Sequence, residues 1–422
     1  MFTRPRTGHR HRAVAAACLV SAMSLLVSAC AGGGDSSTTA AAQKADAPPL
    51  AEYTGPPADS THPIKIGVLY TDDNPIGVTP EIKKAAEAGE QYVNSHGGID
   101  GRTIEIVACN GANNPQNTAR CATQFVNAHV ATVYGLDATW GGVGVEVLNK
   151  AGIVNQTLPI SGPEFTSDNA YPWLASGLTS ASAAATYAAE AGGKAACIYQ
   201  EFASFKEQCL DYFGGTADAK GVEWTPIPIP PNADDLAQYA TKAAGTGAET
   251  ILMIGGVTSV RQVISSAAQI GFKPQWITAT QPSDFYEAMG PLAEGLINFN
   301  DLKDANDPND PDAELFRSIM QTYAPDADTT NFATMIISNL LTLKRLAEEQ
   351  GVGGEQITQE NFANVLKAVK VQQFMGPMLD AAHPIKRYPR AVHTGAYLYQ
   401  RQADGSVKPA GQGYYEFPET ND

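Results

Sequence analysis

Residues 64–109 read IKIGVLYTDDNPIGVTPEIKKAAEAGEQYVNSHGGIDGRTIEIVAC. Both ends of this stretch, residues 64–70 and 104–109, are short apolar runs typical of buried strands, and the alanine-rich segment between them has a helical pattern. Two further apolar runs, residues 131–136 and 153–158, continue the alternation. Strands that alternate with helices in this way predict a parallel sheet.

A second series of the same kind follows Gly177. Its predicted strands and helices are residues 180–192, 195–199, 249–254, 258–270 and 276–279. Residues 63–422 also exceed what one hydrophobic core usually covers. We therefore predict an α/β protein of two lobes, each a mainly parallel sheet flanked by helices. Ligands of such sheets bind at the carboxyl ends of the strands, so the cleft between the lobes is the expected site.

The start of the chain has the pattern of an export signal. A basic segment precedes an apolar run, residues 13–26, that is too short to span a bilayer stably. The sequence Val27-Ser28-Ala29-Cys30 then places small residues before a cysteine, as bacterial lipoproteins do. We expect residues 1–29 to be removed and Cys30 to carry the lipid. An ordinary secreted protein with an incidental cysteine is the alternative.

Lipidation of Cys30 would hold the protein on the extracytoplasmic face of the cell membrane. One acyl chain binds membranes only marginally, so a lasting anchor requires a multiply acylated, palmitate-type cysteine. Residues 30–62 consist mostly of small and polar residues, and they hold too few large apolar side chains to offset the entropy lost on ordering. They are predicted to be a flexible tether, although a poorly ordered terminus without a role has the same composition.

The charge balance excludes one class of partner. The full chain has 28 basic and 44 acidic residues, and loss of the four arginines in the export signal leaves a net charge of −20. Nucleic acid binding requires a basic surface, so we expect none. A strongly acidic surface is instead consistent with a soluble body, which we expect to be a monomer.

Four cysteines of the body form two pairs with the same spacing, Cys109 with Cys121 and Cys197 with Cys209. In an oxidising compartment this even count and short separation predict two local disulfides. Each would contribute about 3 kcal/mol through loop closure. A zinc site is the alternative, but it usually includes a nearby pair of histidines, which the sequence lacks.

Motifs of catalysis are missing from the sequence. It has no phosphate-binding lysine loop, no Gly-x-Ser-x-Gly motif and no His-Glu-x-x-His motif, so we predict no enzyme, metal or cofactor. The turn at Gly141, Gly142 and Gly144 lacks the third glycine of a dinucleotide fingerprint and is interpreted as a close approach of backbone to a ligand. The histidines of the body are interpreted as surface or capping residues; they are His62, His96, His129, His383 and His393.

A specific resemblance comes from Gly97-Gly98-Ile99-Asp100-Gly101, which is followed by the apolar run 102–109 and by Asn114-Pro115-Gln116 before a helix. Tyr92-Val93-Asn94, the helix over residues 330–349 and Phe374-Met375-Gly376-Pro377 follow the same order. Together these segments resemble the type I periplasmic binding proteins of the leucine/isoleucine/valine class. The resemblance covers nearly the whole body.

That resemblance implies a clamshell that closes on a small ligand. Its first lobe would be residues 63–177 plus 298–372, and its second lobe residues 178–297 plus 373–422. Three chain crossings near Gly177, Ile297 and Phe374 would form the hinge. Gly177 and Gly376 suit a hinge because glycine tolerates backbone rotation.

The resemblance also implies where the first lobe meets the ligand. The loop Asp137-Ala138-Thr139-Trp140-Gly141 and the loop Pro159-Ile160-Ser161-Gly162 stand where the family presents hydroxyls and backbone groups to a ligand carboxylate. Thr139, Ser161 and backbone amides would bind an anionic or carbonyl group, and Trp140 would stack on the ligand. Stacking predicts that Trp140→Ala weakens affinity but changes the unfolding free energy by less than about 1 kcal/mol.

The second lobe would contribute Phe205 as an aromatic wall, Val257 where the family often has a tyrosine, and Gln281. Thr280 and Gln281 fall near the acidic residue that pairs with an α-ammonium in amino-acid binders, so an ordinary amino acid is in doubt. Glu201 or Asp284 would supply that charge if the register is shifted. Alternatively, Trp140 and Phe205 are core residues and Ser161 only caps a turn.

Two functions follow. In the first, the protein is the binding lipoprotein of an ABC uptake system and delivers a carboxylate, amide or amino acid to a permease. In the second, the same fold reports a ligand to a membrane signalling partner. A secreted hydrolase has little support, because no nucleophile and base pair is visible.

Overall fold

The computed structural model describes residues 48–72, 79–329 and 332–418, all of them within one compact unit, Ala40–Asp422. The predicted export signal and the lipidated Cys30 lie outside the described residues. No helix in these ranges is long and apolar enough to cross a membrane.

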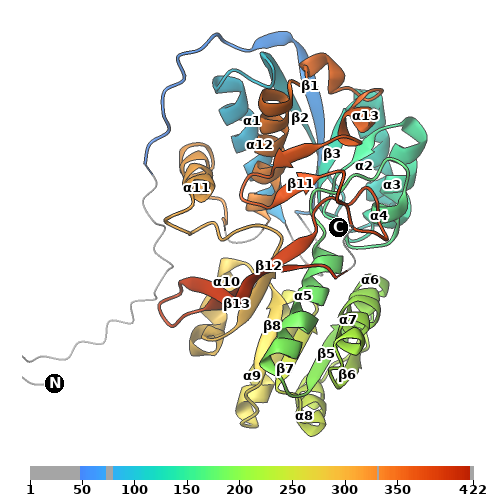
Figure 1. Cartoon of the computed structure of the whole chain (residues 1–422), viewed down its shortest axis with the longest axis vertical. Helices are drawn as coiled ribbons and strands as arrows, with labels where there is room; N and C mark the ends of the chain where they lie inside the picture. Colours follow the sequence, from blue (N-terminus) through green and yellow to red (C-terminus); the bar gives the residue numbers. More distant parts are fainter. Residues whose placement is uncertain (1–47, 73–78, 330–331, 419–422) are drawn as a thin grey trace, which may run out of the picture. The chain divides into compact units, whose positions relative to one another are not determined.

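Strands and helices alternate along most of the chain (Figure 1). The strands are β1 (Asp59–Tyr70), β2 (Arg102–Asn110), β3 (Thr132–Gly135), β4 (Val154–Asn155), β5 (Ala195–Gln200), β6 (Trp224–Ile229), β7 (Thr250–Ile254), β8 (Gln275–Ala279), β9 (Ile297–Asn300), β10 (Lys370–Gln372), β11 (Met378–Asp380), β12 (Gly395–Arg401) and β13 (Val407–Glu416). The α-helices are α1 (Pro80–Ser95), α2 (Pro115–Ala128), α3 (Trp140–Ala151), α4 (Pro163–Thr166), α5 (Ser176–Ala191), α6 (Ala203–Glu207), α7 (Gly215–Ala219), α8 (Ala237–Thr246), α9 (Val257–Gln269), α10 (Ser283–Met289), α11 (Pro311–Tyr323), α12 (Ala333–Gln350) and α13 (Phe362–Leu366). Shorter turns are η1 (Gln208–Gly214), η2 (Gly290–Ala293) and η3 (Gly354–Gln356).

The first sheet has the order β2-β1-β3-β4, and all its strands are parallel. Alternate residues of β1 point to opposite faces, so Ile66 and Val68 join one core cluster and Leu69 joins another. Helices α1 and α12 cover the first of these faces, and α2 and α3 cover the second (Figure 1). This sandwich confirms the predicted α/β arrangement.

The second sheet has the order β13-β12-β9-β8-β7-β5-β6. Strands β6, β5, β7, β8 and β9 are parallel, and β12 and β13 add an antiparallel edge. Helix α5 and η1 pack on one face around Cys197 and Leu252, while α8, α9 and α10 pack on the other around Ile198 and Met253. The mainly parallel second sheet is therefore also as predicted.

The boundaries of the predicted lobes need correction. Strand β9 pairs with β8 and β12, so residues 298–300 belong with the second sheet and not with the first lobe. The hairpin of β10 and β11 packs in the core of the first sheet through Phe374, Met375 and Leu379, so residues 373–380 do not belong with the second sheet.

The chain crosses between the two sheets where neighbouring residues pack in different hydrophobic cores. Leu174 packs in the core of the first sheet and Ala175 in the core of the second. The second crossing lies at Asp301, between β9 and the buried Leu302. The third lies between Leu379 and β12 and is not a single step, because Ile385, Tyr388 and Ala391 pack in the core of the second sheet whereas Val392 packs in that of the first. The predicted hinge at Phe374 and Gly376 is therefore wrong, because both lie in the β10–β11 turn.

The tether predicted for residues 30–62 does not extend through residue 62. Strand β1 already begins at Asp59. Ahead of it, Leu50 packs against the core of the first sheet, the carbonyl oxygen of Pro48 accepts a 2.8 Å hydrogen bond from Ser318 Oγ, and the ring of Tyr53 lies 5.9 Å from that of His96. Residues 48–58 thus contact the body at a few points, although most of them are exposed.

Candidate functional site: a cavity where the two sheets meet

A cavity of about 60 Å³ lies at the carboxyl ends of strands from both sheets. Leu158 follows β4 of the first sheet, whereas Ala279 and Asn300 end β8 and β9 of the second. The lining residues are Leu158, Leu174, Ala279, Thr280, Phe299, Asn300, Asp301, Leu302, Phe332, Thr334 and Met335. Strand ends from the two sheets therefore meet, and a cavity lies between them.

The lining is mostly apolar, with a few polar groups at fixed positions. Thr280 Oγ1 donates to the carbonyl oxygen of Phe299 at 3.3 Å, which holds this threonine against β9. The side chain of Asp301 is almost fully buried, as is that of Thr334. Among the described residues that line the cavity, Asp301 is acidic and none is basic. An apolar lining with few polar groups is typical of a small-molecule site, but such sites usually enclose about 300–1,000 Å³, so a ligand would require this cavity to widen.

Asp301 lies near two other buried polar side chains where the sheets meet, His393 and Gln373. His393 Nε2 lies 3.8 Å from Asp301 Oδ1, and His393 Nδ1 lies 2.9 Å from Gln373 Oε1. Gln373 Nε2 in turn donates to the carbonyl oxygen of Trp173, next to the first crossing, at 2.8 Å. The two contacts of Gln373 are hydrogen bonds, whereas 3.8 Å between His393 and Asp301 is too long for one.

His393 is fully buried, which corrects its predicted place on the surface or at a cap. Burial lowers the pKa of the imidazole to about 4, so the ring is neutral at neutral pH. By contrast, His96 and His129 do cap helices, at the C-termini of α1 and α2. The apolar neighbours Ala391 and Val392 were the available sequence signal for a buried histidine.

The loop Pro159-Ile160-Ser161-Gly162 is engaged by a side chain of the protein itself. Glu164 Oε2 accepts hydrogen bonds from Ile160 N and Ser161 N, both at 3.1 Å, and from Ser161 Oγ at 2.9 Å. Thr157 Oγ1 donates to the other carboxyl oxygen at 3.2 Å. Glu164 is 1% exposed, and this burial raises its pKa to about 7. The donors predicted for a ligand carboxylate are therefore occupied by Glu164.

The loop at residues 137–141 is also satisfied internally. Thr139 Oγ1 lies 2.5 Å from Asp137 Oδ1 and 2.7 Å from Thr118 Oγ1. Gly141 approaches the neighbouring loop so closely that an added Cβ would lie 2.0 Å from Ser161 Oγ. The structure thus brings Gly141 and Ser161 together, as predicted for a close backbone approach, but the contact is within the protein.

Trp140 is a core residue, and its predicted stacking on a ligand is wrong. The side chain is fully buried, its Nε1 donates to Asn155 Oδ1 at 2.9 Å, and its ring lies 6.2 Å from that of Phe125 in an edge contact. This is the core alternative that the sequence left open.

The predicted residues of the second lobe lie near the same edge of the sheet but do not line the cavity. Phe205 is half-buried against the core and contacts Phe202, and Val257 is half-buried at the start of α9. Gln281 is buried, and its Nε2 donates to the carbonyl oxygen of Ala279 at 3.0 Å. Glu201 and Asp284 are exposed. None of the nine predicted ligand contacts is among the residues that line this cavity, so those other than Trp140 remain predictions.

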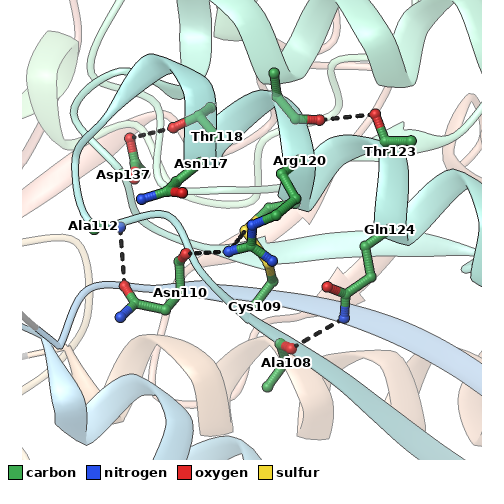
Figure 2. The surroundings of a disulfide bond; sticks show 12 residues. Ala108, Cys109, Asn110, Ala112, Asn117, Thr118, Arg120, Thr123, Gln124 and Asp137 are labelled. Carbon is green, nitrogen blue, oxygen red and sulfur yellow. Dashed lines mark hydrogen bonds between the residues drawn. A yellow bond between two sulfur atoms is a disulfide. The ribbon is translucent and has the colours of Figure 1, made fainter.

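The two predicted disulfides are present and support the loops that follow β2 and β5. Cys109 in β2 is bonded to Cys121 in α2, and Cys197 in β5 is bonded to Cys209 in η1. Figure 2 shows that polar contacts flank the first bond: Arg120 Nη2 donates to the carbonyl oxygen of Asn110 at 3.0 Å, and Asn110 Oδ1 accepts from Ala112 N at 2.9 Å. Helix α2 and the end of β2 are thereby held together in front of the 137–141 loop.

Two mainly parallel sheets with a cavity at their carboxyl ends define an α/β ligand-binding protein. A family model described as periplasmic binding protein matches residues 63–405. The chain therefore belongs to the periplasmic binding protein family. A family of binding proteins agrees with the prediction that the chain is not an enzyme.

Individual relatives are more distant. A Leu/Ile/Val-binding protein homolog from Brucella melitensis is 25% identical over 199 residues, which is 46% of this chain and 54% of the relative. The aligned segment thus spans about half the length of that curated relative. An extracellular ligand-binding receptor from Verminephrobacter eiseniae has a TM-score of 0.70 at 16% identity and covers 82% of this chain and 100% of its own. A solute-binding protein of an ABC transporter from R. palustris, in complex with 4-hydroxybenzoate, has a TM-score of 0.68 at 16% identity. The match covers 85% of this chain and 98% of that protein. At such identities these structures establish the fold alone.

Proposed function

We propose that this chain is an extracytoplasmic solute-binding lipoprotein that closes on a small, partly apolar ligand and delivers it to the permease of an ABC uptake system. The observation that carries the proposal is the largely apolar cavity between strand ends of the two sheets, with Asp301 in its wall. The ligand would be a carboxylate, an amide or an amino acid. Cys30 would anchor the protein to the cell membrane, and the protein would act as a monomer.

The position of the cavity supports a closing mechanism. It is lined by Leu174, Asp301 and Leu302, which lie at or beside the first two crossings of the chain. A ligand that fills the cavity contacts segments from both sheets, so it favours the conformation in which those segments are close. Movement of the sheets about the crossings would then release or capture the ligand.

The relatives support the class of function. The R. palustris neighbour is a solute-binding protein of an ABC transporter, and the Brucella relative has the name of an amino-acid-binding protein. Neither ligand is carried over to this chain, because the identities are low. A sensor that reports ligand to a signalling partner would use the same cavity.

Ligand-induced stabilisation tests the binding function. The chain from residue 30, with Cys30→Ala to keep it soluble, is heated with a library of amino acids, amides, amines, aromatic acids, dicarboxylates and sugars. A ligand at a hundred times its dissociation constant adds about 2.7 kcal/mol to the unfolding free energy, which raises the melting temperature measurably. No shift with any solute would count against the proposal.

Two further experiments test the lipid anchor and identify the membrane partner. The mass of the N-terminal peptide of the exported protein should correspond to a lipidated Cys30, and an unmodified residue would refute the anchor. Crosslinking on membranes should recover a permease with its ATPase. Recovery of a signalling protein instead would favour the sensor.

A further inference from the structure

The wall of the cavity includes residues that belong to different hydrophobic cores. Thr280 lines the cavity shortly before α10, which begins at Ser283 and packs in the core of the second sheet. Phe332 also lines the cavity, but it packs against the core of the first sheet, as does the buried Ala327. Ser283 and Asp328, which are close in sequence to these lining residues, therefore move with different sheets.

A pair of hydrogen bonds joins these two residues. Asp328 Oδ2 accepts from Ser283 N at 3.0 Å, and Asp328 Oδ1 accepts from Ser283 Oγ at 3.3 Å. The two residues are 45 positions apart in the sequence, and both side chains are half-buried. Hydrogen bonds to a carboxylate are about twice as strong as those between neutral groups. Asp328 thus ties the core of the first sheet to α10 of the second sheet.

This contact is made in a conformation that leaves little room for a ligand. The cavity encloses about 60 Å³, whereas small-molecule sites usually enclose about 300–1,000 Å³. Room for a ligand requires wall residues of the two sheets, such as Thr280 and Phe332, to separate. Because Ser283 and Asp328 lie close to these residues in the sequence, such a separation stretches both bonds beyond hydrogen-bonding distance.

We propose that the contact between Asp328 and Ser283 is a latch that holds the two sheets closed in the ligand-free protein. A solute that enters the cavity must then work against the latch. The latch lowers the fraction of molecules that are open enough to bind, and the apparent affinity falls by that fraction. The inference goes beyond the proposed function, because it concerns an equilibrium that exists without any ligand.

The distance between the sheets in the ligand-free protein tests the latch. Spin labels on Glu87→Cys in α1 and Lys242→Cys in α8 are exposed and report on different sheets, in the chain from residue 30 with Cys30→Ala. Pulsed electron paramagnetic resonance should show mainly one short distance. Asp328→Ala should raise the ratio of a longer distance to the short one about tenfold, because hydrogen bonds to a charged group are lost. Asp326→Ala is the matched control, since it removes an exposed carboxylate from the same loop.

Variants of Ser283 test whether Asp328 acts through this residue. Ser283→Ala removes one of the two bonds, so it should shift the ratio less than Asp328→Ala does. In the Asp328→Ala background it should add nothing, because the bond is already lost.

Ser283→Pro removes both donors and should reproduce the effect of Asp328→Ala. Proline is suited to this first position of α10, and the extended backbone of Pro282 is the conformation that a residue before proline prefers. If Asp328→Ala does not fold, the proline variant decides the question.

The outcomes separate the latch from the proposed function. Distances that stay the same in both Asp328→Ala and Ser283→Pro overturn the latch, as does a wild-type protein in which the longer distance predominates. An equal shift with Asp326→Ala also overturns it, because loss of any carboxylate from the loop would then suffice. None of these results depends on a ligand, so the proposed function stands or falls on the solute library alone.

Discussion

Trp140 was predicted from the sequence to contact a ligand, but its packing in the structure makes it a core residue. It directly follows a polar loop at a strand end, where a ligand contact is expected, yet it is fully buried between α3, Phe125 and Asn155. Its position at the start of α3 points the ring toward the second core face of the first sheet. Burial therefore decides its role.

Trp140→Ala should lower the unfolding free energy by about 3–5 kcal/mol, because it leaves a cavity in the core and removes one of the two hydrogen bonds that Asn155 Oδ1 accepts. Ligand affinity of the folded fraction should change little. Denaturant unfolding gives the free energy, and calorimetric titration gives the affinity. Trp224→Ala is the control, since that ring is partly exposed and should cost less. A loss of affinity with unchanged stability would return Trp140 to the ligand site.

At the scale of elements, each disulfide fastens a strand to the helical segment that follows it. The two bonds have the same sequence separation of 12, and all four cysteines are buried. The first bond joins β2 to α2 in the first sheet, and the second joins β5 to η1 in the second sheet. Each bond therefore stabilises a different core.

Replacement of both cysteines of one pair by alanine should lower the unfolding free energy by about 3 kcal/mol for either pair, as loop closure predicts. Denaturant unfolding with and without a reducing agent measures this. The variant without Cys109 and Cys121 should still be destabilised by the reducing agent, but only through the remaining Cys197–Cys209 bond. Equal unfolding curves for oxidised and reduced wild-type protein would contradict a stabilising role.

Some elements were missed in the sequence for identifiable reasons. Strand β6 contains Pro226 and Pro228, which argue against a central strand, but β6 lies at the edge of its sheet, where a missing N–H is tolerated. Strands β12 and β13 follow the last predicted helix; residues 396–399 of β12 form a short apolar run that was not predicted as a strand, and in β13 glycine, proline and polar residues interrupt the apolar ones. Residues 48–58 were assigned to a tether because they have few large apolar side chains, and their contacts with the body come from residues distant in the sequence.

At the scale of the whole molecule, buried ionisable groups link stability to pH in opposite directions. Burial raises the pKa of Glu164 and of Glu81 to about 7 and lowers the pKa of His393 to about 4. A buried glutamic acid keeps its proton in the folded state while the unfolded chain loses it, so its contribution to stability falls as pH rises from about 4.5 through 7. His393 acts oppositely, since only the unfolded chain takes up the proton between pH 6.5 and about 4.

A comparison with Glu164→Gln isolates one of these groups, because Glu81 and His393 are common to both proteins. The unfolding free energy of the wild type, minus that of the variant, should fall by on the order of 1–3 kcal/mol between pH 4.5 and 8 and stay constant below pH 4. Urea unfolding across this pH range measures the difference. A difference that rises with pH would mean that Glu164 is ionised and stabilised by its donors at neutral pH.

The sequence by itself determined the α/β class, the two mainly parallel sheets and both disulfide pairs. These features depend on local information: apolar runs of strand length, helical periodicity between them, and cysteines a few residues from a strand end. The match of these segments to one family in order and spacing also identified the type of fold.

Only the tertiary structure decided which side chains surround the cavity. Leu158, Ala279 and Asp301 lie far apart in the sequence and meet because strand ends of the two sheets face one cavity. Glu164 fills the donors of a loop that looks open in the sequence, and Trp140 turns into a core rather than a cleft. Burial and partner choice at such positions depend on packing between distant segments, and periodicity along one segment carries no information about that packing.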